Sequence, residues 1–215
     1  MNLIITDFDG TFFDDNYLKN INFIESIKDN YDFVIATGRN IKSLKDDLKI
    51  KCKYYICNDG GYILDSEENL IYNNYINDEI MKIVYDRMKE LNYEEYFFDY
   101  INYFDTKINK NINKLSIKIR DNNALNDMDY MLNGLDGVYG YLSNNWINIL
   151  SCESKKECAI DKILELNNYK KIYVIGNEIN DYGMLEKYSG YLISKEKMEG
   201  YKTINNFLEL EKELN

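Results

Sequence analysis

Two carboxylates separated by one residue form the first polar segment of the chain. Asp7 and Asp9 follow directly on the apolar run 3–5, within the segment Asp7-Phe8-Asp9-Gly10-Thr11. Residues two apart on an extended chain point the same way, so a strand that continued through Asp9 would direct both carboxylates into one cleft. Such a pair can share a metal ion or divide the roles of nucleophile and acid. An Asp-Gly turn with two solvated acids is the alternative, because these residues also favour turns.

Polar residues also follow apolar runs later in the chain. Thr37 comes directly after a short apolar run, and Lys156 begins a helical pattern. Asn177 and Asp181 follow another apolar run. Taken singly, Thr37 could cap a helix, Lys156 could be a solvated lysine, and Asp181 could be an acid favoured at a helix start. Together with Asp7 they supply what phosphoryl transfer requires, namely a nucleophile, a hydroxyl and a cation for phosphate oxygens, and acids for Mg²⁺.

Alternating strand and helix patterns are expected to position these residues. Short apolar runs predict buried strands, at residues 3–5, 33–36, 54–57, 171–175 and 191–193. Helical spacing of apolar residues predicts helices, at residues 18–27, 41–48, 156–166, 184–185 and 203–214. Residues 62–72 are expected to form a hairpin. This alternation predicts an α/β fold with a doubly wound parallel sheet, in which ligands bind beyond the carboxyl ends of the strands.

The middle of the chain breaks this alternation. From Asn77 to Ser151 the pattern is helix, two strands, helix, two strands, over residues 80–91, 96–104, 115–119, 125–132, 137–142 and 146–150. The segment Ser143-Asn144-Asn145 is a suitable hairpin turn between the last two strands. This αββαββ order predicts an inserted α+β domain over residues 77–151, with residues 1–76 and 152–215 together forming the core domain.

The composition excludes several classes of function. The net charge of −11 argues against binding to nucleic acid or to an anionic membrane, since both need clustered Lys and Arg. The chain contains no His, which removes the Ser-His-Asp and Cys-His nucleophile systems and the usual zinc ligands. General acid or base chemistry must then come from Asp, Glu, Lys, Tyr or Cys.

Cysteine spacing and apolar run lengths indicate the compartment. The four cysteines, Cys52, Cys57, Cys152 and Cys158, form no C-x-x-C pair, so we expect reduced thiols. No apolar run approaches the ~18 residues of a membrane span, and we find no targeting segment at the N-terminus. We therefore expect a cytoplasmic protein.

The segment Asp7 to Thr11 resembles the first motif of the haloacid dehalogenase superfamily, Asp-x-Asp-Gly-Thr. Thr37, within Ala-Thr-Gly-Arg at 36–39, matches the second motif in the form common in the Cof-like subgroup. Lys156, within Lys-Glu-Cys-Ala at 156–159, matches the third motif, although Lys155 is an alternative. The fourth motif, Gly-Asp-x-x-Asn-Asp, matches residues 176–181 except at its first acid. The resemblance covers nearly the whole chain.

The resemblance implies a fold and a reaction. The core would be Rossmann-like, and residues 77–151 would form a type IIB αββαββ cap. The protein would be a Mg²⁺-dependent phosphatase of a small phosphorylated metabolite, a sugar or polyol phosphate. Asp7 would form an aspartyl-phosphate, and Asp9 would protonate the leaving group and then activate water.

The resemblance also assigns binding roles. Thr37 and Lys156 would hold the phosphate oxygens. The further phosphate- or substrate-binding residues would be Gly10, Thr11, Gly38, Arg39 and Asn180. The Mg²⁺ ligands would be Asp7, Asp9, Asn177 and Asp181. Asn177 stands where the family usually has an acid, so one negative charge is missing and we expect weaker Mg²⁺ binding.

Three other functions remain as alternatives. Phosphomutases have similar caps, and a weak phosphate-binding or regulatory protein would be consistent with Asn177. A phospho-receiver domain also pairs acids at a strand end, but it has about half this length and no α+β insert. The substrate and the oligomeric state are not predicted.

Three further features have a structural and a functional interpretation. The segment Asn58-Asp59-Gly60-Gly61 lies where Cof-like proteins often have Asn-Gly, and we favour a plain turn that ends a strand. Arg39 would contact phosphate or pair with an acid. The aromatic residues of the insert between 93 and 104 are expected mainly to pack against its helix layer.

Overall fold

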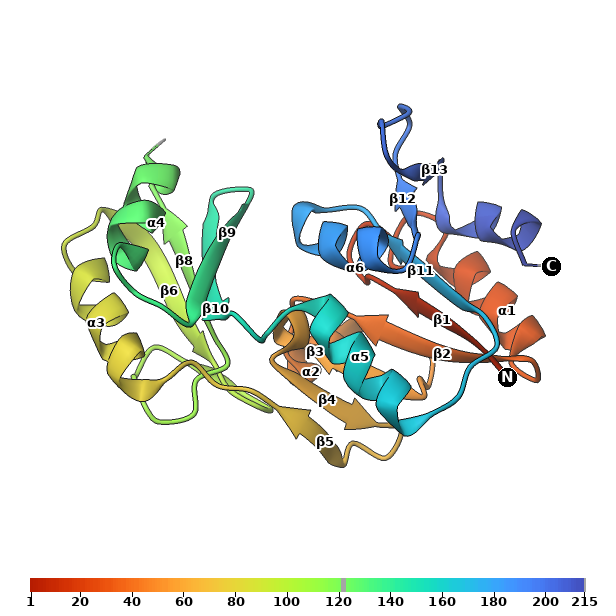
Figure 1. The fold of residues 1–215 in the computed structure, drawn as a ribbon, viewed down its shortest axis with the longest axis horizontal. Helices are drawn as coiled ribbons and strands as arrows, with labels where there is room; N and C mark the ends of the chain where they lie inside the picture. The colour runs from red at the N-terminus through yellow and green to blue at the C-terminus, as the bar shows by residue number, and fades with distance from the viewer. Residues whose placement is uncertain (121–122, 215) are drawn as a thin grey trace.

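The computed structural model describes residues 1–120 and 123–214, whose helices and strands are arranged around two sheets (Figure 1). The larger sheet has eight strands in the order β13-β12-β11-β1-β2-β3-β4-β5. Six of them are parallel: β1 (Asn2–Thr6), β2 (Tyr31–Ala36), β3 (Tyr54–Cys57), β11 (Ile172–Gly176), β12 (Tyr191–Ile193) and β13 (Lys202–Ile204). The hairpin strands β4 (Tyr62–Asp65) and β5 (Leu70–Asn73) continue the sheet in antiparallel pairing.

Helices cover both faces of the larger sheet because its central strands are apolar on both sides. Ile4 of β1 packs with α1 (Tyr17–Ile27) and α2 (Ile41–Asp47) on one face. Leu3 and Ile5 pack on the other face with α5 (Lys156–Leu166) and α6 (Tyr182–Lys187). The predicted doubly wound α/β core is therefore confirmed.

The strand order creates a crevice at the carboxyl end of β1. The chain passes from β1 to β2 and β3 on one side, and it returns to β11 on the other side of β1. Thr6 lies beside Ile35 of β2 and Ile175 of β11, so the residues that follow these strands emerge together. Ligands of open α/β sheets bind at such a reversal of strand order.

The smaller sheet has the order β7-β6-β8-β10-β9 and is antiparallel throughout. Its strands are β6 (Tyr93–Asp99), β7 (Phe104–Asp105), β8 (Lys114–Ile119), β9 (Val138–Ser143) and β10 (Trp146–Ser151). The helices α3 (Asp78–Met88) and α4 (Ala124–Leu132) pack on the face that is turned away from the larger sheet (Figure 1). We call this unit the cap and keep 77–151 as its proposed boundaries.

Alternation along the cap strands sorts their side chains between two faces. Phe98, Leu115 and Ile149 are buried against the helices. The alternate residues pair across the strands: Phe97 lies opposite Ser116, Ser116 opposite Asn148, and Asn148 opposite Tyr141. These polar and aromatic side chains form the other face of the cap sheet.

The structure corrects two element predictions. The strand expected over 96–104 is β6, which starts at Tyr93 and ends at Asp99. Residues 203–214 are not one α-helix, because residues 202–204 form β13 and a 3-10 helix, η3 (Phe207–Lys212), follows. Phe207 and Leu210 of η3 are buried, and their spacing of three matches the three residues per turn of a 3-10 helix. None of the helices in the described ranges is long and apolar enough to cross a membrane.

Candidate active site

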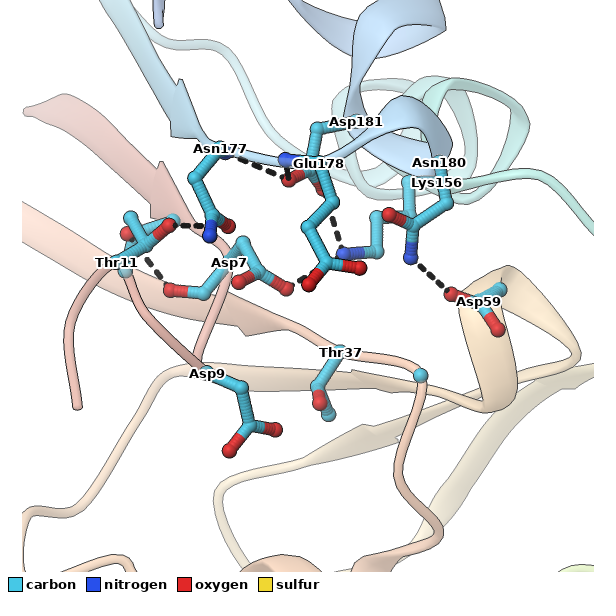
Figure 2. A network of polar contacts seen from close by, with 12 residues as sticks. Asp7, Asp9, Thr11, Thr37, Asp59, Lys156, Asn177, Glu178, Asn180 and Asp181 are labelled. Atoms are coloured by element: carbon cyan, nitrogen blue, oxygen red, sulfur yellow. Dashed lines mark hydrogen bonds and ion pairs between the residues drawn. The ribbon is translucent and has the colours of Figure 1, made fainter. Parts of the chain in front are cut away.

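Side chains from five segments meet at the carboxyl end of the parallel strands (Figure 2). Asp7 follows β1, Thr37 follows β2 and Asn177 follows β11. Lys156 is the first residue of α5, and Asp181 is the last residue of a 3-10 turn, η2 (Ile179–Asp181). The structure thus brings together Asp7, Thr37, Lys156, Asn177 and Asp181, the five residues that the sequence singled out for phosphoryl transfer.

A buried lysine joins two of the acids. The Lys156 ammonium lies 2.7 Å from Asp7 Oδ1 and 2.7 Å from Asp181 Oδ1. The side chains of Lys156 and Asp181 are 0% exposed and that of Asp7 is 9% exposed. Burial raises the pKa of Asp7, against the lowering effect of Lys156. Burial alone would lower the pKa of Lys156, but Asp181 and Asp7 raise it, so the lysine stays charged.

Asp181 has protein partners on both carboxylate oxygens. Oδ1 binds Lys156, while Oδ2 accepts backbone N–H groups of Asn177 (2.8 Å) and Glu178 (3.0 Å). Gly176 is required beside it, because a Cβ there would lie 2.5 Å from the Asp181 Cβ. We therefore infer that Asp181 positions Lys156 and the loop after β11.

Asp9 does not share the direction of Asp7. Both carboxylates would point into one cleft only if β1 continued through Asp9, but β1 ends at Thr6. The Asp9 side chain is 50% exposed. Arg39 binds it through two hydrogen bonds, from Nη2 at 2.5 Å and from Nε at 2.8 Å. Arg39 also pairs with Asp47 at 2.7 Å. The sequence left two roles open for Arg39, contact with phosphate or pairing with an acid. In this structure Arg39 pairs with acids.

The predicted phosphate-binding residues near the turns already have partners within the protein. The buried Thr37 hydroxyl accepts the backbone N–H of Arg39 at 3.1 Å, which shapes the turn through Gly38. The backbone N–H of Gly10 donates to the carbonyl of Phe13 at 3.1 Å. Phosphate binding through Gly10 would require this turn to adjust.

Sequence analysis missed a buried acid that joins the core to the cap. Asp59 lies in the turn η1 (Asn58–Gly60) with φ of 55° and is 1% exposed. It accepts hydrogen bonds from Lys114 of β8, Tyr141 of β9 and Asn180, each at 2.8 Å. The Asn180 side chain therefore points to Asp59 (Figure 2). The turn at Asp59 does more than end a strand.

The charge of Asp59 is stabilised by its partners. Burial alone would raise its pKa, but Lys114 and Lys156, with hydrogen bonds from Lys114 and Asn180, lower the pKa of Asp59 to about 2. Lys114 also donates to the carbonyl of Gly38 at 3.1 Å. The sequence signals for this link are an Asp in a Asn-Asp-Gly-Gly turn and a lysine at the first position of a cap strand.

Replacing Asp59 with Asn is expected to lower the free energy of unfolding by about 2 kcal/mol near neutral pH, because Lys114 loses its buried counter-ion. The folded pKa is below the ordinary 3.8, so this stabilisation is present above about pH 4 and is lost toward pH 2. Urea unfolding at a series of pH values would measure it, with exposed Asp136→Asn as the control. A difference that does not shrink in acid would contradict the ion pair.

The site opens into a pocket of about 420 Å³ between the core and the cap. The core contributes Asp7, Asp9 and Arg39 to its lining. The cap contributes, among others, Lys114, Tyr141, Ser143, Trp146 and Asn148. A small polar molecule in this pocket would contact Asp7 at one end and cap side chains at the other.

Oxygen atoms, the ligands that Mg²⁺ prefers, can converge beside Asp7. One atom of the Asn177 amide lies 3.3 Å from Asp7 Oδ2 and 3.3 Å from the Asp9 backbone carbonyl oxygen. If that atom is Oδ1, three oxygens face one another, an arrangement that a cation would stabilise. Across residues 1–120 and 123–214, no group of three or more His, Cys, Asp or Glu side chains could hold a metal ion. The donors fit Mg²⁺, but with a single carboxylate.

Comparison with protein families agrees with this geometry. Residues 4–103 match the family model of haloacid dehalogenase-like hydrolases. This part of the chain is therefore similar to haloacid dehalogenase-like hydrolases. No curated protein matches the chain by sequence.

Solved structures of haloacid dehalogenase-like proteins share the fold of nearly the whole chain. A haloacid dehalogenase-like hydrolase from B. subtilis aligns with a TM-score of 0.82 and 17% identity, covering 100% of both chains. A HAD/COF-like hydrolase from Plasmodium vivax aligns with a TM-score of 0.80 and 17% identity over 94% of this chain and 89% of that one. A HAD subclass IIB sugar phosphatase aligns with a TM-score of 0.71 and 17% identity over 92% and 89%. The cap is therefore part of the shared fold.

Proposed function

We propose that this haloacid dehalogenase-like hydrolase is a Mg²⁺-dependent phosphatase of a small phosphorylated metabolite. The observation that carries the proposal is the buried Asp7 carboxylate, which opens into the pocket while Lys156 holds one of its oxygens at 2.7 Å. A carboxylate placed in this way can attack phosphorus, and the lysine can neutralise charge on the phosphate. The family match over residues 4–103 and the structural neighbour described as a sugar phosphatase support the same reaction.

The first step forms an aspartyl-phosphate on Asp7. An oxygen of Asp7 attacks the phosphorus atom, the bond to the leaving oxygen breaks, and that oxygen takes a proton from Asp9. Thr37 and Lys156 are placed to bind the phosphate oxygens once the substrate displaces their present contacts. When bound, Mg²⁺ would neutralise phosphate charge, with Asp7, the Asp9 carbonyl and Asn177 as its ligands.

The second step needs Asp9 as a base. Water gives a proton to Asp9 while its oxygen attacks the phosphorus, which releases phosphate and restores Asp7. Arg39 binds the Asp9 carboxylate in this structure, and that hydrogen bond raises the pKa of Arg39. Since the first step needs protonated Asp9, we infer that Asp9 separates from Arg39 when substrate enters.

The pocket lining favours a hydroxylated leaving group. Lys114, Tyr141, Ser143 and Asn148 present donors and acceptors from the cap at the mouth of the site. These groups already have protein partners, but the third N–H of Lys114 and the amide N–H groups of Asn148 can still donate to hydroxyl groups of a sugar or polyol phosphate, which an aliphatic chain lacks. We therefore propose a sugar or polyol phosphate as the substrate.

Phosphate release from a panel of phosphomonoesters would test the proposal. We expect turnover of sugar or polyol phosphates that rises with Mg²⁺ into the millimolar range and stops when EDTA is added. No turnover of any panel member at millimolar Mg²⁺ would contradict the proposal. Mass analysis of the products separates the alternatives, since a phosphomutase returns the phosphate to another position of the sugar. Binding of Mg²⁺ and phosphate without turnover would indicate a binding or regulatory protein.

A further inference from the structure

The side-chain amide of Asn177 lies where a cation would be expected to neutralise two oxygens. One of its atoms is 3.3 Å from Asp7 Oδ2, 3.3 Å from the Asp9 carbonyl oxygen and 2.9 Å from the Thr11 hydroxyl. The carboxylate and the carbonyl carry no hydrogen, so they accept only. The atom that faces them is either the oxygen or the nitrogen of the amide, which occupy equivalent positions after half a rotation.

The two orientations of the Asn177 amide are favoured in different states of the site, one with a bound cation and one without. With Oδ1 inward, the Thr11 hydroxyl donates to it at 2.9 Å, but it faces two other oxygens without a hydrogen between them. With Nδ2 inward, the amide hydrogens can reach Asp7 Oδ2 and the Asp9 carbonyl, and the oxygen then faces donors on the other side. The inward nitrogen is therefore preferred without a cation, and the inward oxygen is preferred with one.

Gly10 provides the space for this amide. Its φ is 71°, and a Cβ at Gly10 would lie 2.7 Å from the outer atom of the Asn177 amide. The amide is therefore packed against the turn that carries the Asp9 carbonyl. Whichever of Oδ1 and Nδ2 is turned inward faces Asp7 Oδ2 and the Asp9 carbonyl oxygen. An Asp at position 177 would have no hydrogen to offer in either orientation.

We infer that Asn177 is a metal-responsive amide that takes the place of Mg²⁺ in the metal-free protein. Without the ion, Nδ2 bridges Asp7 and the Asp9 carbonyl, and the site stays assembled. When Mg²⁺ binds, the amide turns and presents Oδ1. This inference rests on the Mg²⁺ site of the proposed function. It makes the stability of the chain less dependent on Mg²⁺ than an Asp at position 177 would, and it weakens Mg²⁺ binding.

Thermal unfolding of the full chain with EDTA and with MgCl₂ tests the inference. In EDTA, Asn177→Asp should unfold about 5 °C below wild type, because its carboxylate faces Asp7 Oδ2 and the Asp9 carbonyl without a hydrogen. Saturating Mg²⁺ should raise the unfolding temperature of Asn177→Asp by more than that of wild type. Calorimetric titration should show Mg²⁺ binding at least about 10-fold tighter in the variant. Exposed Asn92→Asp adds the same charge and should match wild type.

The side-chain amide can also be observed directly by ¹⁵N NMR. The Asn177 side-chain amide signals can be assigned as those that are missing from the spectrum of Asn177→Asp. In EDTA its hydrogens should exchange slowly with solvent, and saturating Mg²⁺ should shift the signals and speed up their exchange. Asn92 provides the reference, since its signals should change in neither condition.

Two results would overturn the inference. One is that Asn177→Asp is as stable as wild type, or more stable, in EDTA. The other is that the Asn177 amide signals stay unchanged at saturating Mg²⁺. These outcomes are separate from catalysis: a chain whose amide responds to Mg²⁺ but that hydrolyses no phosphomonoester would support the amide's role and reject the proposed phosphatase.

Discussion

Replacing Asp7 with Asn is expected to reduce phosphate release by about 10⁴-fold or more, because the neutral amide cannot attack phosphorus as a carboxylate does. The side chain keeps its size, so the fold should persist. Steady-state phosphate release with the best panel substrate would measure the loss. Exposed Asp86→Asn on α3 is a matched control that should retain full turnover. Retention of more than a tenth of the activity by Asp7→Asn would contradict a nucleophilic role.

The same variant has an expected effect on stability. Burial raises the pKa of Asp7 above its ordinary value of 3.8, so the folded chain disfavours the ionised carboxylate. The free energy of unfolding of the wild type should therefore fall relative to that of Asp7→Asn as the pH rises above about 4. A variant that is more stable than wild type but inactive would show that the site is assembled at a cost in stability.

Replacing Lys156 with Met is expected to lower the free energy of unfolding by about 3–5 kcal/mol at neutral pH. The change leaves Asp7 and Asp181 buried without their common counter-ion, although Met fills most of the space. For a chain of this length, the unfolding temperature should fall by about 10 °C. Urea unfolding would measure the effect, which should diminish in acid, where Asp7 becomes protonated.

Lys155→Met is the matched control for Lys156→Met. Lys155 is half-buried, and its ammonium lies 5.2 Å from the centre of the Tyr139 ring. Losing this cation–π contact should cost about 1 kcal/mol or less. Equal destabilisation by the two variants would contradict the assignment of Lys156 as the lysine of the site.

The sequence contains enough information to place the carboxylate, the lysine and their supporting elements. The helix α5 begins at Lys156, as predicted, because the apolar spacing of residues 156–166 matches one buried helical face. The strands β1, β2 and β11 were predicted from short apolar runs, which sheets buried on both faces require. Parallel order then implies that Asp7, Thr37 and Asn177 emerge at one edge.

Other parts of the site depend on contacts that no local pattern encodes. The ion pair of Asp59 with Lys114 joins the core to the cap across 55 residues, and neither residue belongs to the four motifs of the resemblance. Asp9 turns toward Arg39 because β1 ends at Thr6, a detail that the apolar run 3–5 does not specify. The C-terminal 3-10 helix was missed because its spacing of three resembles helical periodicity over a short segment.

The position of β1 in the larger sheet has a consequence for synthesis of the chain. Its partner β2 follows soon after it, but its other partner, β11, is made only after the whole cap. Until then, a nascent chain on the ribosome carries a central strand with one unpaired edge and an uncovered apolar face. Such edges are sites of intermolecular pairing. The inserted cap therefore prolongs the interval in which the growing chain depends on rapid translation or on chaperones.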